Sequence, residues 1–255
     1  MAWPVMTPRA RSSRWRAGPA TPSAPMTTPT PEPIRLMLFD IAGTLMRDTG
    51  RTPAAYRAVL EDAGLEADEA WIRRRIGMRK TTVFAELLAA AGRSESEAES
   101  LAEAFDAVFL DDLDRTPPER LPGAAESWDA MRAAGVLVGW ISGFSREVGD
   151  ACIRGLGLTP DVAVGSDEVA EGRPAPDLVQ MAMRRTGVAD PRTVAVCGDT
   201  PRDLECGTAA ECGLVVGVGH GTHQLEELAG WPHTHLVPDL VGFEHLVLGT
   251  HPPNG

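Results

Sequence analysis

The stretch R-L-M-L-F-D-I-A-G-T-L at residues 35–45 limits the fold more than any other part of this chain. Its apolar run, Leu36 to Phe39, stops at Asp40. A short apolar run that ends at a polar loop predicts a strand buried on both faces of a parallel sheet. An acid directly after such a strand lies at the sheet edge where open α/β folds bind ligands, although a turn-forming aspartate is the alternative.

Helical patterns fill residues 50–118. Thr52 followed by Pro53 indicates an N-cap and a proline at the first helical position, and Gly64 indicates the end of this helix. A capping box of Ser94 and Glu97 predicts the start of the last helix. The helices are predicted over residues 52–64, 68–76, 80–91 and from 94 to just before Pro117.

Strands and helices alternate after this segment. Repeated strand–helix units predict a parallel sheet with right-handed crossovers. The fold class is therefore α/β, with a Rossmann-like parallel core (34–49 and 119–249) and a helical cap (50–118) inserted after the first strand. The later strands are predicted at 136–141, 161–164, 193–197, 214–218 and 235–237, and the later helices at 146–156, 177–186 and before Cys212.

The two ends of the chain differ from the rest. Residues 1–33 are rich in Pro, Ser, Thr, Ala and Arg and lack periodicity, so a disordered N-terminal extension is predicted there. They contain no apolar stretch of the kind that a secretory signal needs. Residues 250–255 are predicted to be a tail.

Charge and cysteine content narrow the class of protein. The net charge is −12, and the excess of acids argues against nucleic acid as a partner. No apolar segment is long enough to predict a membrane span. The four cysteines (152, 197, 206 and 212) form no C-x-x-C pair and predict reduced core residues of a cytoplasmic protein. Arginine outnumbers lysine by 23 to one, and the single lysine is Lys80.

Polar residues recur where the predicted strands end. Phosphoryl transfer needs a nucleophile in line with the bond that breaks, donors for the phosphoryl oxygens and a cation that offsets their charge. Mg²⁺ prefers a few carboxylates together with water and substrate phosphate. The residues of this kind are Asp40, Ser142-Gly143, Arg173, Asp199 and Asp203. Turn and cap roles are the alternative for Asp199 and Asp203.

These four motifs, in this order and with a cap in this place, resemble the haloacid dehalogenase superfamily. The resemblance implies that Asp40 is a nucleophile that forms an aspartyl-phosphate. It implies that phosphate is bound by Ser142, Gly143, Arg173, Gly43 and Thr44. It also implies Mg²⁺ as the cofactor, at a site of Asp40, Ala42, Asp199 and Asp203.

One subgroup fits the local sequence better than the others. Phosphatases of the superfamily have a second Asp two residues after the nucleophile, whereas this chain has Ala42, which resembles phosphonatase (phosphonoacetaldehyde hydrolase). Arg173 also matches that subgroup. Gly77-Met-Arg-Lys80 matches the segment whose lysine forms a Schiff base with the substrate aldehyde, so Lys80 is the second candidate catalytic residue. Departures from the phosphonatase pattern are Val83, Ile76 and Phe144.

Several interpretations stay open at this point. The first is a Mg²⁺-dependent hydrolase that cleaves the C–P bond of a small phosphonate, and the alternative is P–O cleavage in a small phosphorylated metabolite. A catalytically weak phosphoanion-binding protein is the third, because Ala42 lacks the usual acid–base group. Lys80 is either a solvated lysine or an amine whose pKa is lowered by the helix start and by Arg79. The partner of this chain is expected to be a small phosphonate or phosphorylated metabolite, and a homodimer is a possible assembly.

Overall fold

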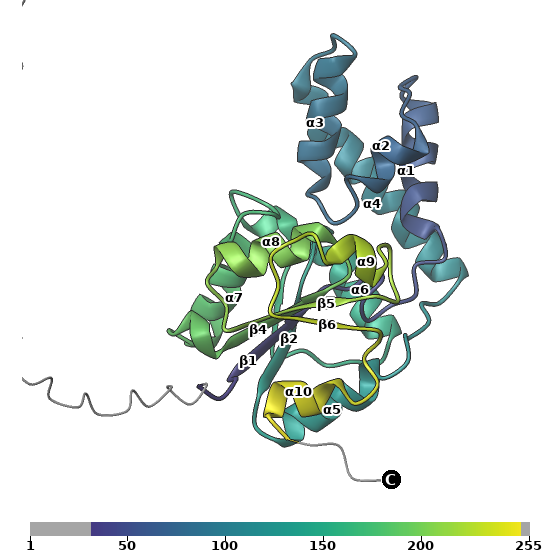
Figure 1. Cartoon of the computed structure of the whole chain (residues 1–255). Coiled ribbons are helices and arrows are strands. Elements are labelled where there is room, and N and C mark those ends of the chain that lie inside the picture. Colours follow the sequence, from purple (N-terminus) through teal and green to yellow (C-terminus); the bar gives the residue numbers. More distant parts are fainter. Residues whose placement is uncertain (1–31, 251–255) are drawn as a thin grey trace, which may run out of the picture. The chain divides into compact units, whose positions relative to one another are not determined.

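A six-stranded parallel sheet lies at the centre of the computed structural model, which describes residues 32–250 (Figure 1). The strand order is β3-β2-β1-β4-β5-β6, so β1 lies between β2 and β4. Leu36 of β1 pairs with Leu137 of β2 on one side and with Val194 of β4 on the other. The strands are β1 (Leu36–Phe39), β2 (Leu137–Ile141), β3 (Val162–Val164), β4 (Val194–Gly198), β5 (Leu214–Val218) and β6 (His235–Val237).

The apolar run of β1 is buried on both faces of the sheet, as predicted. Phe39 faces one side, where its ring lies 5.8 Å from that of Trp128 and 5.9 Å from that of Phe243. Leu36 and Leu38 face the other side and belong to a second buried cluster with residues of α7 and α8. This alternation follows from the two-residue period of a strand, and it fixes the direction of Asp40 at the strand end.

Helices connect the strands and cover both faces of the sheet (Figure 1). The helices after the first strand are α1 (Arg51–Asp62), α2 (Glu69–Arg73), α3 (Lys80–Ala90) and α4 (Ala98–Arg115). Those that follow are α5 (Ala124–Ala133), α6 (Arg146–Gly155), α7 (Asp177–Thr186), α8 (Pro201–Ala209), α9 (Leu225–Leu228) and α10 (Phe243–Leu248). Short 3₁₀ turns lie at Glu95–Glu97, Ser166–Glu168 and Pro191–Thr193. The α/β fold class is therefore confirmed.

Helices α1 to α4 come between β1 and α5 in the chain, and we call residues 50–118 the helical insert. Its interior is aromatic: the Tyr56 ring lies 4.8 Å from Phe105 and 5.6 Å from Phe84. Phe109 of α4 lies 4.7 Å from Phe144, which follows β2 in the core. The insert therefore shares buried contacts with the loop at the carboxyl end of β2.

The start of α1 differs from the prediction. Thr52 is not the N-cap, because Gly50 holds that position with a φ of 89° and Arg51 is the first helical residue. The Asp48 carboxylate caps the helix instead: its Oδ1 accepts hydrogen bonds from the backbone N–H groups of Gly50 at 3.0 Å and Arg51 at 2.9 Å. Asp48 therefore replaces the predicted threonine hydroxyl and leaves the Thr52 side chain free for another contact.

Other boundaries also differ. α2 ends at Arg73, not Ile76, because the chain tightens into i→i+3 bonds and turns at Gly77, which has a φ of 87°. The Ser94 side chain caps a 3₁₀ turn, and the Glu97 carboxylate pairs with Arg93, so the predicted capping box is wrong. Helices α5, α9 and α10 were not predicted, since their apolar stripes are short.

The remaining predictions concern the termini, the cysteines and the membrane. Most of the predicted extension and tail, residues 1–31 and 251–255, lies outside the described residues. All four thiols are free, with Cys152, Cys197 and Cys206 buried and Cys212 partly exposed. Across residues 32–250, every helix is too short or too polar to cross a bilayer.

Candidate active site

Asp40 lies directly after β1, at the edge of the sheet. Its backbone N–H donates to the Cys197 carbonyl at 2.9 Å, which extends the pairing of β1 with β4 by one residue. The following loop closes on itself, because the Ile41 carbonyl accepts the N–H groups of Leu45 and Met46. Asp40 is 5 % exposed, so the parallel sheet and this turn hold a carboxylate in a nearly dry position.

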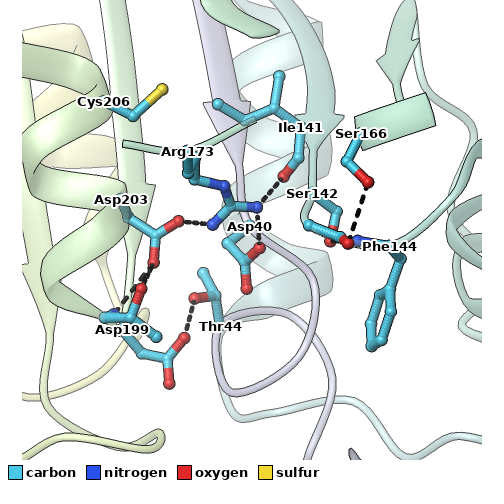
Figure 2. A network of polar contacts seen from close by, with 12 residues as sticks. Asp40, Thr44, Ile141, Ser142, Phe144, Ser166, Arg173, Asp199, Asp203 and Cys206 are labelled. Carbon is cyan, nitrogen blue, oxygen red and sulfur yellow. Dashed lines mark hydrogen bonds and ion pairs between the residues drawn. The ribbon is translucent and has the colours of Figure 1, made fainter. Parts of the chain in front are cut away.

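Arg173 joins three strand ends (Figure 2). Its Nη2 donates to Asp40 Oδ1 at 2.5 Å and to the Ile141 carbonyl at 2.9 Å, and its Nη1 pairs with Asp203 Oδ1. The guanidinium side chain is fully buried. A buried arginine between two carboxylates fixes the geometry of both and offsets part of their charge. Asp40 Oδ2 is left outside this ion pair.

Asp199 and Asp203 follow β4. The Asp203 Oδ2 atom accepts the Thr200 N–H at 3.0 Å and its hydroxyl at 2.6 Å, which forms a capping box at the start of α8. Asp199 accepts the Thr44 hydroxyl at 3.2 Å and the Thr222 N–H at 2.5 Å. The cap role considered for Asp203 is therefore present, and it leaves Asp203 in contact with Arg173.

The three acids form a group with the spacing of metal ligands. One carboxylate oxygen from each of Asp40, Asp199 and Asp203 lies within 4.8 Å of the others, and all three residues are buried. Burial, and next the charge of Asp40, raise the pKa of Asp199 to about 7. A cation at this point would relieve that repulsion, so the residues present fit a hard divalent ion such as Mg²⁺. The remaining predicted residue, Ala42, can offer only backbone atoms.

The glycine at position 43 is required by this arrangement. Its φ is 86°, and a Cβ atom there would collide with the Asp199 carboxylate. The Gly43 N–H donates to the Met46 carbonyl at 2.7 Å, and the Thr44 hydroxyl donates to Asp199. In the described structure, the side chain of Thr44 and the N–H of Gly43 therefore both have protein partners.

Ser142 and Gly143 lie beside Asp40, after β2. The Ser142 hydroxyl is buried and accepts the Phe144 N–H at 3.3 Å, and the Gly143 carbonyl accepts the Ser166 hydroxyl at 3.1 Å (Figure 2). A Cβ atom at Gly143 would collide with the backbone of Gly77 in the helical insert. The core loop and the insert thus touch through backbone atoms, with no side chain between them.

Lys80 is the first residue of α3 and is 4 % exposed, so it is not a solvated lysine. Its Nζ donates to the carbonyls of Met78 and Gly143, both at 3.2 Å. The rings of Phe144 and Phe105 lie 4.8 and 5.0 Å from Nζ. Among residues 32–250, no carboxylate lies within ion-pair distance of this amine.

Burial lowers the pKa of Lys80 from 10.5 to about 8, and the nearby charge of Arg173 acts in the same direction. The charge of Asp106 on α4 opposes this effect. The sequence predicted that the helix start and Arg79 lower this pKa. Lys80 does open α3, but Arg79 is not among the groups that lower the pKa of Lys80. Its guanidinium instead donates to the carbonyls of Val169 and Ala170, at 2.9 and 3.1 Å.

Asp40, Lys80 and Ser142 line one small pocket. The other lining residues are Ala42, Thr52, Ile76, Gly77, Gly143, Phe144 and Thr200. Its volume is about 10 Å³, which is about the space that one water molecule needs. Arg73 and Arg79 of the insert both bond to core carbonyls nearby. In this arrangement the pocket has room for little more than one water molecule.

The sequence analysis did not predict that Thr52 and Asp106 lie close to Lys80. Thr52 lines the pocket, and its hydroxyl is buried and has no hydrogen-bond partner among the described residues. Asp106 lines a second pocket of about 230 Å³ together with Lys80. Burial raises the pKa of Asp106, whereas Ser145 and the Lys80 charge lower it. An acid one position after a core phenylalanine was the only sequence signal for Asp106.

Comparisons with known proteins agree with this arrangement. A family model described as a haloacid dehalogenase-like hydrolase matches residues 34–211. The protein named "Probable phosphatase IndB" from Dickeya dadantii is 28 % identical over 84 % of this chain and 94 % of its own length. A phosphonoacetaldehyde hydrolase from Latilactobacillus sakei is 25 % identical over 69 % of this chain and 72 % of its own.

The fold has solved counterparts. The crystal structure of a phosphonoacetaldehyde hydrolase-like protein from Oleispira antarctica superposes with a TM-score of 0.74. The match covers 85 % of this chain and 92 % of that one, at 18 % identity. At this identity the likeness concerns the fold.

Proposed function

Because the chain belongs to the haloacid dehalogenase-like hydrolase family, we propose that it is a Mg²⁺-dependent, phosphonatase-like hydrolase. Its proposed substrate is a small phosphonate with an aldehyde group, and the bond that it cleaves is the C–P bond. One observation carries this proposal: a buried lysine amine, with its pKa at about 8, lines the same pocket as the Asp40 carboxylate. A phosphate ester needs no amine at this position.

Lys80 is proposed to act first. At neutral pH part of the Lys80 population is uncharged, because its pKa is about 8. The neutral amine attacks the aldehyde carbon, and the adduct takes up one proton from solvent and loses water, which gives an iminium. The iminium then accepts the electron pair of the C–P bond as that bond breaks, which gives an enamine. Arg stays protonated throughout and has no equivalent reaction.

Asp40 is proposed to accept the phosphoryl group. Arg173 holds Asp40 Oδ1 at 2.5 Å, so Oδ2 is the oxygen available for attack on phosphorus. The same guanidinium pairs with Asp203, which keeps it in place while charge moves onto the phosphoryl oxygens. Water then cleaves the aspartyl-phosphate, and a second water returns Lys80 to its free amine.

The phosphoryl oxygens also need a positive charge in addition to that of Arg173. We propose that Asp40, Asp199, Asp203 and the Ala42 backbone carbonyl would hold Mg²⁺, since the three carboxylates offer oxygens within 4.8 Å of one another. The metal would offset the charge of the phosphoryl oxygens. Gly143 and Ser142 are proposed to bind those oxygens, since both line the pocket beside Asp40.

A phosphatase that cleaves P–O bonds is the second candidate. It is favoured by the relative named "Probable phosphatase IndB", which matches 84 % of this chain. It is disfavoured by Ala42, because an alkoxide leaving group needs an acid that alanine cannot supply. An iminium that collects the electrons of a C–P bond has no such need.

The deciding experiment is a substrate screen with phosphonoacetaldehyde and simple phosphomonoesters, in the presence of Mg²⁺. We expect turnover of phosphonoacetaldehyde, a borohydride-trapped adduct on Lys80, and loss of both in Lys80→Arg. Lys80→Arg keeps the positive charge but removes the titrating amine, so it separates the two roles. If Lys80→Arg is as active as the wild type and no adduct forms, the chain acts as a phosphatase.

A further inference from the structure

The Thr52 hydroxyl is a buried polar group that has no hydrogen-bond partner among residues 32–250. Thr52 is 2 % exposed, and within residues 32–250 its Oγ1 neither donates nor accepts a hydrogen bond. A threonine at the second position of a helix normally bonds to nearby backbone. Here Asp48 already caps the helix start, so the hydroxyl has no local role. A buried polar group left without a partner costs stability, and a retained one calls for an explanation.

The direction of Thr52 is set by α1. Tyr56 follows one helical turn later on the same face, and its ring centroid lies 5.8 Å from Lys80 Nζ. Thr52 itself lines the small pocket that contains both Lys80 and Asp40. Thr52 therefore belongs to the wall of this pocket, on the side of the helical insert from which Lys80 also comes.

The neighbouring donors divide this pocket into two chemical parts. Ser142 and Asp40 belong to the core side of the pocket, where the phosphoryl group is proposed to bind, and Arg173 bonds to Asp40. Lys80 and Thr52 belong to the helical insert, and the ring of Phe144 lies 4.8 Å from Lys80 Nζ. Thr52 is thus placed for the organic part of the substrate and not for its phosphorus.

We propose that the Thr52 hydroxyl donates a hydrogen bond to the aldehyde oxygen that Lys80 attacks. This inference rests on the proposed function and names the feature of the substrate that the insert recognises. As the N–C bond forms, the C=O π pair moves onto oxygen and a proton passes from nitrogen to that oxygen. A second proton, taken from solvent, then turns this hydroxyl into the water that leaves as the iminium forms. A donor aimed at the developing oxyanion stabilises the first of these steps, whereas a simple phosphate ester has no aldehyde oxygen for it to stabilise.

The test compares Thr52→Val, which keeps the shape but removes the hydroxyl, with Thr52→Ser, which keeps the hydroxyl. With phosphonoacetaldehyde, Thr52→Val should lower kcat/KM and the rate of borohydride trapping on Lys80 by about 10²-fold. Thr52→Ser should stay within several-fold of the wild type.

Thermal unfolding without substrate separates a substrate contact from a structural role. Because the hydroxyl lacks a protein partner, Thr52→Val should keep or raise the Tm. Thr193→Val is the matched control, since Thr193 is equally buried but its hydroxyl donates to the Asp190 carbonyl at 2.8 Å, away from the site. That control should lower the Tm and leave kcat/KM unchanged.

The outcomes are distinct. If the wild type cleaves phosphonoacetaldehyde and Thr52→Val does so within threefold of it, the Thr52 inference is wrong and the proposed function stands. If Thr52→Val lowers the Tm as much as Thr193→Val does, the hydroxyl is structural and the inference is again wrong. If the wild type neither cleaves this substrate nor forms an adduct on Lys80, the proposed function fails and the inference fails with it.

Discussion

The burial of Lys80 predicts how the free energy of unfolding changes with pH, and this prediction does not depend on any substrate. Its amine is fully buried, its partners are two backbone carbonyls, and burial lowers its pKa from 10.5 to about 8. A depressed lysine pKa means that the folded state binds the proton less well than the unfolded state. Stability should therefore increase as the pH rises from about 8 to about 10.5, and Lys80→Met should abolish this increase.

The magnitude follows from the size of the depression. The folded pKa lies about 2.5 below the unfolded one, which corresponds to about 3 kcal/mol at 1.36 kcal/mol per pH unit. Below pH 8 the charged amine costs the fold this full amount. At pH 9.5 the cost falls to about 1 kcal/mol, since the folded amine is then neutral while the unfolded one is still charged. The wild type should thus gain about 2 kcal/mol between pH 7 and pH 9.5, relative to the variant.

Urea unfolding at the two pH values measures this gain, with chelator and reductant present. The quantity of interest is the free energy of unfolding of the wild type minus that of Lys80→Met, at each pH. Subtraction removes the titration of the cysteines and of Tyr56, which both proteins share. In the variant the carbonyls of Met78 and Gly143 lose their donor. This cost does not depend on pH, so it cancels when the differences at the two pH values are compared. No other lysine interferes, because the chain has only one.

Lys80→Arg is the second control. Arginine stays charged across this pH range, so this variant should also lack the gain, although it carries the charge that methionine lacks. A difference between wild type and Lys80→Met that changes by less than about 0.5 kcal/mol from pH 7 to 9.5 would refute the reasoning. The amine would then be solvated, and the case for a neutral nucleophile near pH 7 would weaken with it.

Three further predictions concern turnover of the best substrate. Asp40→Asn should lower kcat by about 10⁴-fold or more without loss of the native circular dichroism spectrum, since the amide keeps the size of the nucleophile but not its reactivity; a loss below tenfold would exclude the assignment. Chelation should abolish activity, and Asp199→Ala should raise the Mg²⁺ concentration for half-maximal rate by about tenfold or more; full activity after exhaustive chelation would contradict this. Arg79→Ala removes two hydrogen bonds between the insert and the core. If these bonds hold the insert over the bound substrate, their loss of about 1 kcal/mol should raise KM about fivefold. An unchanged KM would argue against closure of the insert through this contact.

The sequence was informative wherever a residue's position follows from strand geometry. Asp40, Ser142 and Asp199 were predicted to meet because each follows a parallel strand, and such strands end at one edge of the sheet. The structure brings them together with Arg173, as that reasoning requires (Figure 2). The hydrogen-bond partners of these residues could not be predicted from the sequence. The bond from the Thr222 N–H to Asp199, for example, depends on a loop that has no periodic pattern.

Side-chain direction in the helical insert is what the sequence could not provide. Thr52 before proline has the pattern of a helix cap, and only the competing Asp48 carboxylate shows that its hydroxyl is free of that role. Asp106 had the pattern of a solvated acid on α4, because nothing local indicates that Lys80 lines the same pocket. Both outcomes were decided by packing between elements distant in sequence, which local propensity does not encode.

Lys80 shows how the two kinds of evidence combine. A single lysine among 23 arginines suggested a position that arginine cannot fill, but chance placement explained the count equally well. The structure supplies a physical reason. Aromatic rings and two carbonyls surround the amine, and burial there disfavours a permanent charge. Lysine meets this constraint by giving up its proton near pH 8, whereas arginine cannot do so at any useful pH. The same burial that costs the fold about 3 kcal/mol leaves a neutral amine in the pocket of Asp40, so stability and reactivity at this position are expected to change in opposite directions.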